Sequence, residues 1–187
     1  MVVDWGRTTN LTGHRNLGEV VEHLVVDAIA LQKALEDEID APGSGEAVDL
    51  GSGAGFPGIP IAMIRPGLRV SLVESRERRH HFQRAVRRQL AVANIEPRWG
   101  RIEALSPAPA DLVFAQAVAP PSQALAWAMD WVRPGGILVI PGGAEPPEPG
   151  SHGDLARQGT GTYGVPGASR VRSFWWCERQ GPEAPPV

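Results

Sequence analysis

The chain has 187 residues, a formal net charge of −3 and a hydrophobic fraction of 42%, as expected for an ordinary globular protein. Its single cysteine, Cys177, excludes an internal disulfide and a multi-cysteine metal site. No apolar run approaches the roughly 20 residues of a membrane span, and the N-terminus lacks the residue order of a signal peptide. We therefore expect one cytoplasmic domain over residues 1–187, with no role in a membrane.

Residues 1–40 predict a helical lead segment. Polar residues, with Thr, Asn and Gly prominent, characterise residues 4–15, and apolar residues then recur at helical spacing from Leu17 to Ile39. One proline and two glycines at 41–45 end this helix before the next element.

Short apolar runs alternate with helical patterns between residues 46 and 141. We expect strands at 47–50, 69–74, 95–99, 111–115 and 136–140, and helices at 59–64, 76–92 and 122–132. Strands that alternate with helices pair in parallel, and the helices cover both faces of the sheet. The predicted fold class is therefore α/β, a Rossmann-like, doubly wound and mostly parallel sheet with flanking helices and an N-terminal lead helix.

Glycine and proline are frequent in the chain beyond Pro141. We expect a flexible loop over 142–168, a terminal strand over 169–180 and a frayed tail over 181–187. One strand after this loop is thus predicted to be the last regular element of the fold.

A glycine-dense turn follows the first predicted strand. Glycines occupy positions 51, 53 and 55 of the run from Asp49 to Gly55, and a missing Cβ lets the backbone approach a ligand closely and adopt a positive φ. The turn lies at the carboxyl end of a strand, where open α/β sheets bind ligands. Its spacing differs from the G-x-G-x-x-G of dinucleotide binders, which disfavours a pyrophosphate ligand.

An acidic residue, Glu74, ends the second predicted strand. A carboxylate at this position can accept hydrogen bonds from both hydroxyl groups of a ribose. The glycine turn and Glu74 together indicate a nucleoside cofactor, which we interpret as the S-adenosylmethionine of a methyltransferase. The alternative interpretation is a purely structural turn beside a solvated carboxylate.

The run from Gly51 to Pro60, G-S-G-A-G-F-P-G-I-P, resembles the signature of the GidB family, also called RsmG. The resemblance extends to residues 9–12, His23 with Asp27, Glu74 with Ser75, Asn94 and residues 100–103. This family consists of class I methyltransferases that transfer a methyl group from S-adenosylmethionine to N7 of a guanine in small-subunit (16S) ribosomal RNA. The resemblance therefore implies ribosomal RNA or the small ribosomal subunit as partner.

The resemblance also implies roles for individual residues. Residues of the turn would surround the methionine part of the cofactor, Glu74 would hold its ribose, and Ile102 and Glu103 would lie beside the adenine. The implied cofactor-binding set is Asp49, Gly51, Ser52, Gly53, Ala54, Gly55, Phe56, Glu74, Ser75, Ile102, Glu103 and Gln116. Phe56, Pro57, Arg101 and Gln116 would position the reactants, since the guanine nitrogen has a free lone pair and needs no catalytic base. No metal is expected.

The RNA-binding residues implied or expected are Asn10, Arg101, Arg84, Arg87 and Arg88. On a helical wheel the last three point away from an apolar side formed by Phe82, Val86 and Leu90. Such a face can hold phosphates. The alternative is an ordinary solvated surface, which is the norm for the outer face of a helix. His23 is expected to be a buried residue that hydrogen bonds to Asp27 one helical turn further on.

The chain departs from the family's pattern in three places. The family usually carries additional helical sequence before residues 5–12, and it has an arginine where this chain has Gln116 and a lysine where it has Pro141. The missing cations remove charge-assisted contacts worth about 1.5–3 kcal/mol each. Three functions stay open: a ribosomal RNA guanine methyltransferase, a methyltransferase of the same descent that acts on a small nitrogen heterocycle, and a cofactor- or RNA-binding protein without catalysis.

Overall fold

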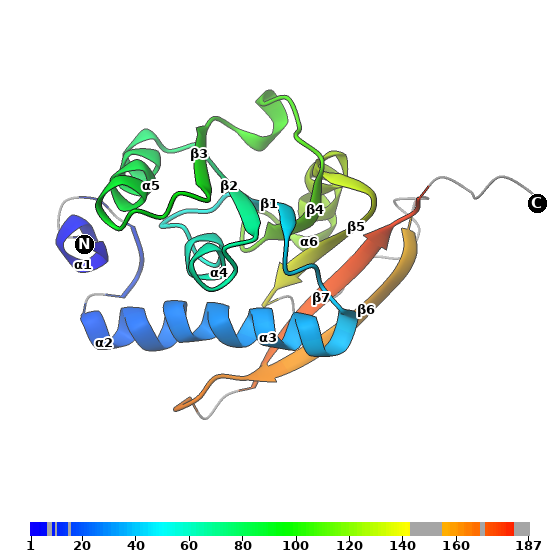
Figure 1. The fold of residues 1–187 in the computed structure, drawn as a ribbon, viewed down its shortest axis with the longest axis horizontal. Coiled ribbons are helices and arrows are strands. Elements are labelled where there is room, and N and C mark those ends of the chain that lie inside the picture. Colours follow the sequence, from blue (N-terminus) through cyan, green and yellow to red (C-terminus); the bar gives the residue numbers. More distant parts are fainter. Residues whose placement is uncertain (7–8, 10, 15, 143–154, 169–170, 182–187) are drawn as a thin grey trace, which may run out of the picture.

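A seven-stranded sheet forms the centre of the computed structural model, which describes all residues except 7–8, 10, 15, 143–154, 169–170 and 182–187. The order of the strands is β3-β2-β1-β4-β5-β7-β6 (Figure 1). Their bounds are β1 Gly45–Leu50, β2 Leu68–Glu74, β3 Ile95–Trp99, β4 Ala110–Ala115, β5 Val132–Pro141, β6 Leu155–Gly164 and β7 Val171–Arg179. Strands β1 to β5 pair in parallel, and β7 runs antiparallel to both of its neighbours. The predicted fold class, a doubly wound and mostly parallel α/β sheet with flanking helices, is confirmed.

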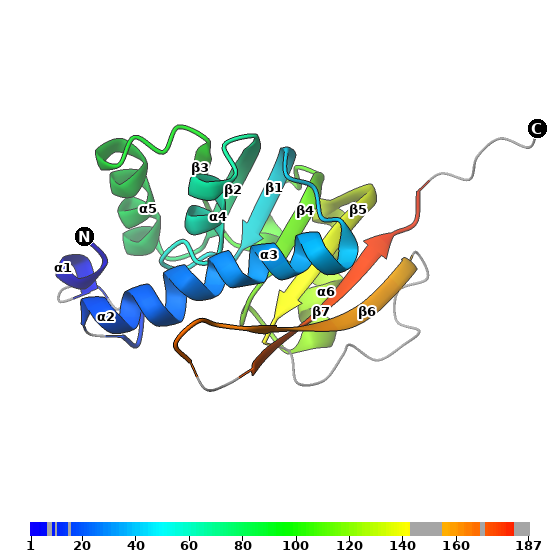
Figure 2. The same cartoon turned by 60° about the horizontal axis from the view of Figure 1, so that its bottom comes forward.

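Helices cover both faces of this sheet. The α-helices are α1 Val2–Gly6, α2 Leu17–Val20, α3 Asp27–Ile39, α4 Gly58–Ile64, α5 Glu77–Gln89 and α6 Pro121–Ala128. A π-helical segment, η1 Val21–Val26, joins α2 to α3, and two short 3₁₀ turns are η2 Ile102–Ala104 and η3 Met129–Trp131. Figure 2 shows α3 lying across one face of the sheet and alongside the β6–β7 hairpin. Among the described residues, no helix combines the length and the apolar character that crossing a bilayer requires.

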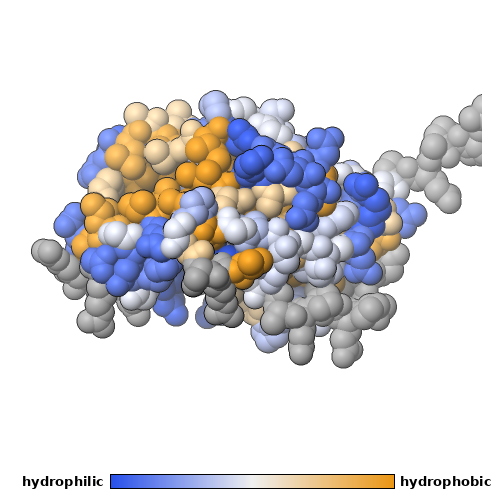
Figure 3. Space-filling model, turned by 90° about the horizontal axis from the view of Figure 1, so that it is seen from below, coloured by the Kyte–Doolittle hydropathy of each residue, from blue (hydrophilic) through white to orange (hydrophobic). Residues whose placement is uncertain are grey.

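Alternate residues of the strands build two separate apolar cores. In β4, Leu112 and Phe114 point into the core under α3, α4 and α5, whereas Val113 and Ala115 point into the core under α6 and η3. This alternation follows from the two-residue period of a strand, and burial on both sides explains the nearly continuous apolar runs in the sequence. Seen from below, hydrophobic surface gathers mainly on the half of the molecule that carries the N-terminal elements (Figure 3).

The loop predicted over 142–168 is wrong over residues 155–164, which form β6, whereas residues 165–168 lie outside the strands. Gly161 reflects close packing rather than a flexible turn, because a Cβ there would collide with the ring of Phe174 and with Glu38. Tyr163 in the same strand is buried against α3. Residues 143–154 of the predicted loop lie outside the described residues. The predicted terminal strand corresponds to β7.

Two expectations for helical side chains are also wrong. Asp27 accepts a hydrogen bond from the Tyr163 hydroxyl at 3.2 Å and pairs with Arg172 at 3.1 Å, and no hydrogen bond joins it to the half-buried His23. The π-helical turn that contains His23 alters the expected spacing, and both partners come from the β6–β7 hairpin. Leu90 is 53% exposed because it is the C-cap of α5, where the wheel no longer applies.

Candidate cofactor and acceptor site

The carboxyl ends of three neighbouring strands bring the predicted cofactor residues to one edge of the sheet. Leu50 of β1 is in register with Val73 of β2 on one side and with Ala115 of β4 on the other. The glycine turn, Glu74 and Gln116 each follow or end one of these strands, and they therefore lie at the same edge. This is the edge at which open α/β sheets bind ligands.

The three glycines of the turn serve different purposes. All have positive φ, +64° for Gly51, +58° for Gly53 and +84° for Gly55. A Cβ on Gly51 would collide with Val118, and one on Gly55 would collide with Ile59. A Cβ on Gly53 would find its nearest atom at 3.8 Å. Gly51 and Gly55 therefore permit close packing within the protein, whereas the backbone at Gly53 borders open space that a ligand can approach.

Glu74 is bound to the turn by a direct hydrogen bond. Its Oε2 accepts from the backbone N–H of Gly53 at 2.9 Å, and its Oε1 accepts from the backbone N–H of Arg76 at 2.6 Å. The guanidinium of Arg79 lies 3.9 Å from Oε2. Only 3% of Glu74 is exposed. The hydroxyl of Ser75 also donates to Oε1, at 3.5 Å. Because a carboxylate offers about four acceptor positions, Glu74 retains capacity for one further donor. The exposed Ser75 hydroxyl can turn to solvent and free a second position, which would fit the two hydroxyl groups of a ribose.

A buried amide on α5 fixes the start of the turn. Gln83 is fully buried, and its Nε2 donates to Ser52 Oγ at 2.8 Å and to the Gly53 carbonyl at 2.9 Å. The hydroxyl of Ser52 in turn donates to the carbonyl of Val73 in β2 at 3.2 Å. The Ser52 side chain is therefore engaged inside the protein, where it holds the turn in place.

Asp49 carries an orphaned oxygen beside the turn. Its Oδ2 accepts from the backbone N–H of Gly58 at 2.9 Å, whereas its Oδ1 has no hydrogen-bond partner among the described residues. The side chain is 1% exposed, and burial, together with the nearby charge of Glu74, raises the pKa of Asp49 to about 7. A buried acceptor without a donor fits a cationic ligand group such as the ammonium of a methionine.

The predicted adenine side of the site follows β3. The backbone N–H of Gly100 donates to the Glu74 carbonyl at 3.0 Å, and Trp99 Nε1 donates to the Ser75 carbonyl at 3.1 Å. Ile102 is 9% exposed and belongs to the second core. Arg101, Glu103 and Ser75 are exposed at this rim.

The predicted acceptor side is formed by the segments after β1 and β4. Phe56 is half-buried and Pro57 is buried, and a cis peptide bond joins them. Gln116 is half-buried next to Ala117, whose φ is +53°. Residue 118 of this segment packs against Gly51. The two segments therefore lie against each other. Pro141, at the position of the family's lysine, is buried at the end of β5.

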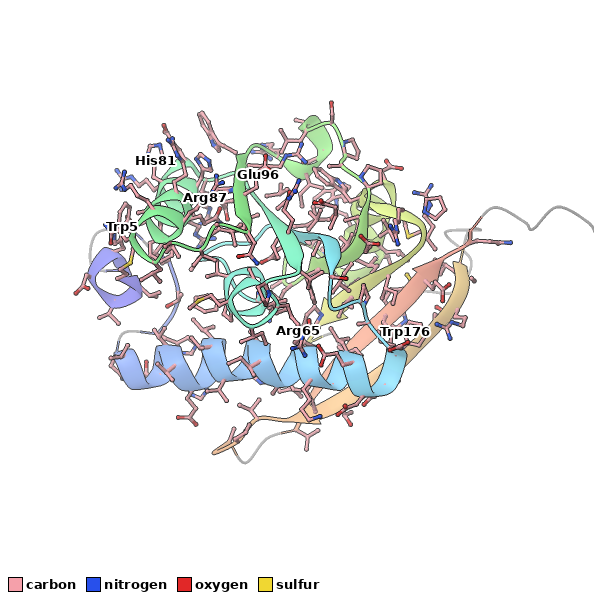
Figure 4. All side chains as sticks on the ribbon, in the orientation of Figure 1. Trp5, Arg65, His81, Arg87, Glu96 and Trp176 are labelled. Atoms are coloured by element: carbon pink, nitrogen blue, oxygen red, sulfur yellow. The ribbon has the colours of Figure 1, made fainter. Side chains whose placement is uncertain are left out.

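The predicted RNA-binding residues are not all brought to this edge. Arg84, Arg87 and Arg88 line a separate hollow at the C-terminal end of α5, and Figure 4 shows Arg87 and His81 on this helix. Arg101 lies at the rim of the glycine turn's edge, after β3. Asn10 lies outside the described residues.

Sequence reasoning missed Arg79 and Gln83, the two α5 side chains nearest the turn. Gln83 was detectable, because it lies beside Val86 on the buried side of the helical wheel and a polar residue there needs a partner. Arg79 carries no comparable signal, since arginines are frequent along the whole helix.

Comparison with known proteins agrees with this geometry. Residues 1–149 match the family model described as GidB, rRNA small subunit methyltransferase G. The chain is 37% identical over 149 residues to a "Ribosomal RNA small subunit methyltransferase G" of Xanthomonas campestris pv. campestris, an alignment that covers 79% of this chain and 67% of that protein. It is 32% identical over 182 residues to the protein of the same name from Bordetella pertussis, covering 94% of this chain and 79% of that protein.

Solved structures share the fold at low sequence identity. A crystal structure of a mutant of MtNAS in complex with S-adenosylmethionine superposes with a TM-score of 0.62 at 18% identity, covering 81% of this chain and 62% of that chain. This likeness concerns the fold alone. The family model and the identity to these relatives show that the chain belongs to the GidB family, rRNA small subunit methyltransferase G, a family of S-adenosylmethionine-dependent methyltransferases.

Proposed function

We propose that this chain methylates N7 of a guanine in small-subunit ribosomal RNA. The acceptor is suggested by the names of the relatives and by the family's signature in residues 51–60. The observation that carries the methyl-transfer part of the proposal is the bond between Gly53 N–H and Glu74, because it places an open glycine backbone beside a carboxylate with free acceptor capacity. A ribosomal acceptor implies a cytoplasmic location.

Three groups would hold the cofactor. Glu74 would accept the ribose hydroxyls, the Gly53 backbone would lie against the methionine part, and the orphaned Oδ1 of Asp49 would accept from the ammonium group. When bound, S-adenosylmethionine supplies an electrophilic methyl group on a positively charged sulfur. The guanidinium of Arg79 lies 3.9 Å from Glu74 Oε2 and places a positive charge beside this carboxylate.

Phe56, Pro57, Arg101 and Gln116 would hold the acceptor. Methylation of a guanine N7 forms an N–C bond and breaks an S–C bond, and the positive charge passes from sulfur to the base. No proton is lost, so the reaction needs alignment of the nitrogen with the methyl group rather than a base. The half-buried ring of Phe56 offers an apolar wall, and Gln116 offers an amide that can donate to or accept from a base edge.

A second acceptor class is favoured by one observation. The two cations of the family's pattern are absent at Gln116 and Pro141, and Pro141 is buried, so neither position offers a charge to a phosphate. A small neutral nitrogen heterocycle would need no such charge.

One experiment separates the two acceptors. The full chain is incubated with methyl-labelled S-adenosylmethionine and either small ribosomal subunits that lack the modification or a panel of azaheterocycles. Label in ribosomal RNA at a guanine N7 supports the proposal, and label only in small molecules supports the second acceptor. Absence of label in both, together with measured cofactor binding, would overturn both in favour of a binding protein. Glu96→Gln, an exposed change on β3, serves as the active control.

A further inference from the structure

Arginines without a partner are confined to one segment of the described chain. Outside residues 76–101, every described arginine is held by an acidic side chain or a backbone carbonyl, as in the pairs Arg65–Glu36, Arg133–Asp111 and Arg157–Glu178. Within that segment, six arginine side chains have no hydrogen-bond or ion-pair partner among the described residues: Arg76, Arg78, Arg84, Arg87, Arg88 and Arg101. The free cations thus gather on α5 and its flanks.

Local charge along α5 contrasts with the charge of the whole protein. The chain carries a formal net charge of −3, yet residues 78–95 contain five arginines and no acidic residue. Like charges three and four residues apart on a helix repel each other. A bound polyanion would relieve this repulsion, whereas a purely solvated helix face gains from interspersed acidic residues.

Three of these arginines share one face of the helix. Arg84, Arg87 and Arg88 are spaced i, i+3 and i+4, opposite the buried Phe82, and with Ala91 and Ala93 they line a hollow of about 420 Å³. All three are exposed. The spacing presents three planar guanidinium groups side by side, a geometry that suits phosphate oxygens.

An exposed aromatic ring extends this face toward the glycine turn. Trp99 is 55% exposed and lies parallel to the ring of His80, with centroids 6.3 Å apart and an interplanar angle of 19°. His80 precedes Arg84 by one helical turn. Trp99 Nε1 donates to the carbonyl of Ser75, the residue after Glu74. The Trp99 ring therefore lies beside the rim of the candidate cofactor site, and the arginines follow His80 along the same helix toward its C-terminal end.

We infer that this α5 surface, defined as Arg84, Arg87, Arg88 and Trp99, docks a single-stranded segment of the RNA that the site methylates. Arginine forks would bind its phosphates, and the Trp99 ring would stack on a base or a ribose. The combination favours RNA over an acidic protein, which offers no base to the ring. The inference rests on the proposed function. In it, the α5 surface supplies the positive charge that the family's arginine and lysine would supply at positions 116 and 141.

The test measures binding of a fluorescent single-stranded oligoribonucleotide by anisotropy over a series of salt concentrations. In the triple variant Arg84→Gln, Arg87→Gln, Arg88→Gln, we expect affinity to fall about 10- to 100-fold at low salt, and the slope of log K against log salt to become shallower by about 2, since each phosphate contact on a single strand contributes about 0.7. Trp99→Leu should weaken binding with little change in the slope.

A matched triple variant controls for the loss of three charges. Lys33→Gln, Arg69→Gln, Arg157→Gln removes three exposed cations from other elements and should bind the oligoribonucleotide almost as the wild type does. Unchanged affinity and slope in the α5 variant, or an equal loss in the control, would overturn the inference. Tighter binding of polyglutamate than of RNA by the wild type would assign the surface to an acidic protein instead.

Methylation of small ribosomal subunits is measured on the same variants. If the α5 variant binds RNA normally while the wild type methylates the subunits, the inference fails and the proposed function stands. If the wild type binds the oligoribonucleotide through α5 but labels no ribosomal RNA, the proposed function fails. Cofactor titration, expected to be equal in all these arginine variants, reports whether the fold is intact.

Discussion

The backbone N–H of Gly53 donates a 2.9 Å hydrogen bond to the carboxylate of Glu74, and this bond joins the turn after β1 to the end of β2. The two residues are 21 positions apart in the chain, yet parallel pairing of β1 and β2 brings them to one edge. The arrangement couples the conformation of the glycine turn to the residue proposed to hold the ribose. Changes at either end should therefore affect both stability and cofactor binding.

Replacement of Gly55 by alanine should lower the free energy of unfolding more than replacement of Gly53. Gly55→Ala combines a positive φ with a collision against Ile59, and we expect it to lower the free energy of unfolding by about 2–4 kcal/mol. Gly53→Ala meets no atom within 3.4 Å, so only backbone strain of about 1–2 kcal/mol is expected. Urea unfolding measures both values. Equal costs would show that packing does not require Gly55.

Gln83 should stabilise the turn through its buried amide. Gln83→Leu keeps the approximate shape of the side chain but leaves Ser52 Oγ and the Gly53 carbonyl without their donor. We expect the free energy of unfolding to fall by about 1–3 kcal/mol. The affinity for the cofactor should also fall, because the turn loses this support. Gln89→Leu, at an exposed position of the same helix, is the control and should change stability by less than about 0.5 kcal/mol. Comparable losses in both variants would contradict this role for Gln83.

Asp49 should make stability depend on pH. Burial raises the pKa of Asp49 from its ordinary value of 3.8 to about 7 in the folded protein. Between these two values the unfolded chain releases a proton that the folded chain retains. The free energy of unfolding should therefore fall with rising pH, at most by about 1.4 kcal/mol per pH unit, and this contribution becomes constant above about pH 7.

Asp49→Asn removes this titration while its amide oxygen can still accept from Gly58. Relative to the wild type, the variant should gain stability from about pH 4 to 7, as measured by urea unfolding at several pH values. Asp130→Asn, at an exposed position, should follow the wild-type profile. Parallel profiles for the wild type and Asp49→Asn would show that Asp49 is ionised throughout.

Tyr163 should help to hold the β6–β7 hairpin against α3. Tyr163→Phe removes the hydroxyl that donates to the buried Asp27 at 3.2 Å, while Arg172 remains as a partner, so we expect a loss of about 1 kcal/mol in unfolding free energy. Thr162→Val removes an exposed hydroxyl from the same strand and should have little effect. A neutral Tyr163→Phe variant would show that this hydrogen bond contributes nothing.

Patterns of local sequence predicted the central part of the fold, and the failures have identifiable causes. Strands β2 and β4 and the second half of β1 and of β5 are largely apolar and buried on both faces, which makes them visible in the sequence. In β3 only Ile95 is buried, so its signal is weaker. In strand β6, Phe174 and Glu38 leave no space for a side chain at residue 161, and this requirement for glycine arises only in the folded protein. The π-helical turn before Asp27 likewise departs from the regular helical period that the sequence pattern assumes.

The candidate site likewise contains residues that the sequence predicted and residues that it did not. Its glycines and Glu74 follow strands directly, so topology alone brought them together, whereas Gln83 and Arg79 reach the turn from α5 across the packed helix–sheet interface. A helical wheel marks Gln83 as a buried polar residue, but its partner can be identified only once the position of α5 on the sheet is known.

Calorimetric titration of the wild type and of Glu74→Gln with S-adenosylmethionine and its demethylated product tests the central claim most directly. The wild type should bind both ligands, and Glu74→Gln should bind them about 10- to 100-fold more weakly, because a charge-assisted acceptor for the ribose becomes neutral. Glu96→Gln should match the wild type. Absence of heat with the wild type, or equal affinities for the wild type and Glu74→Gln, would contradict the account.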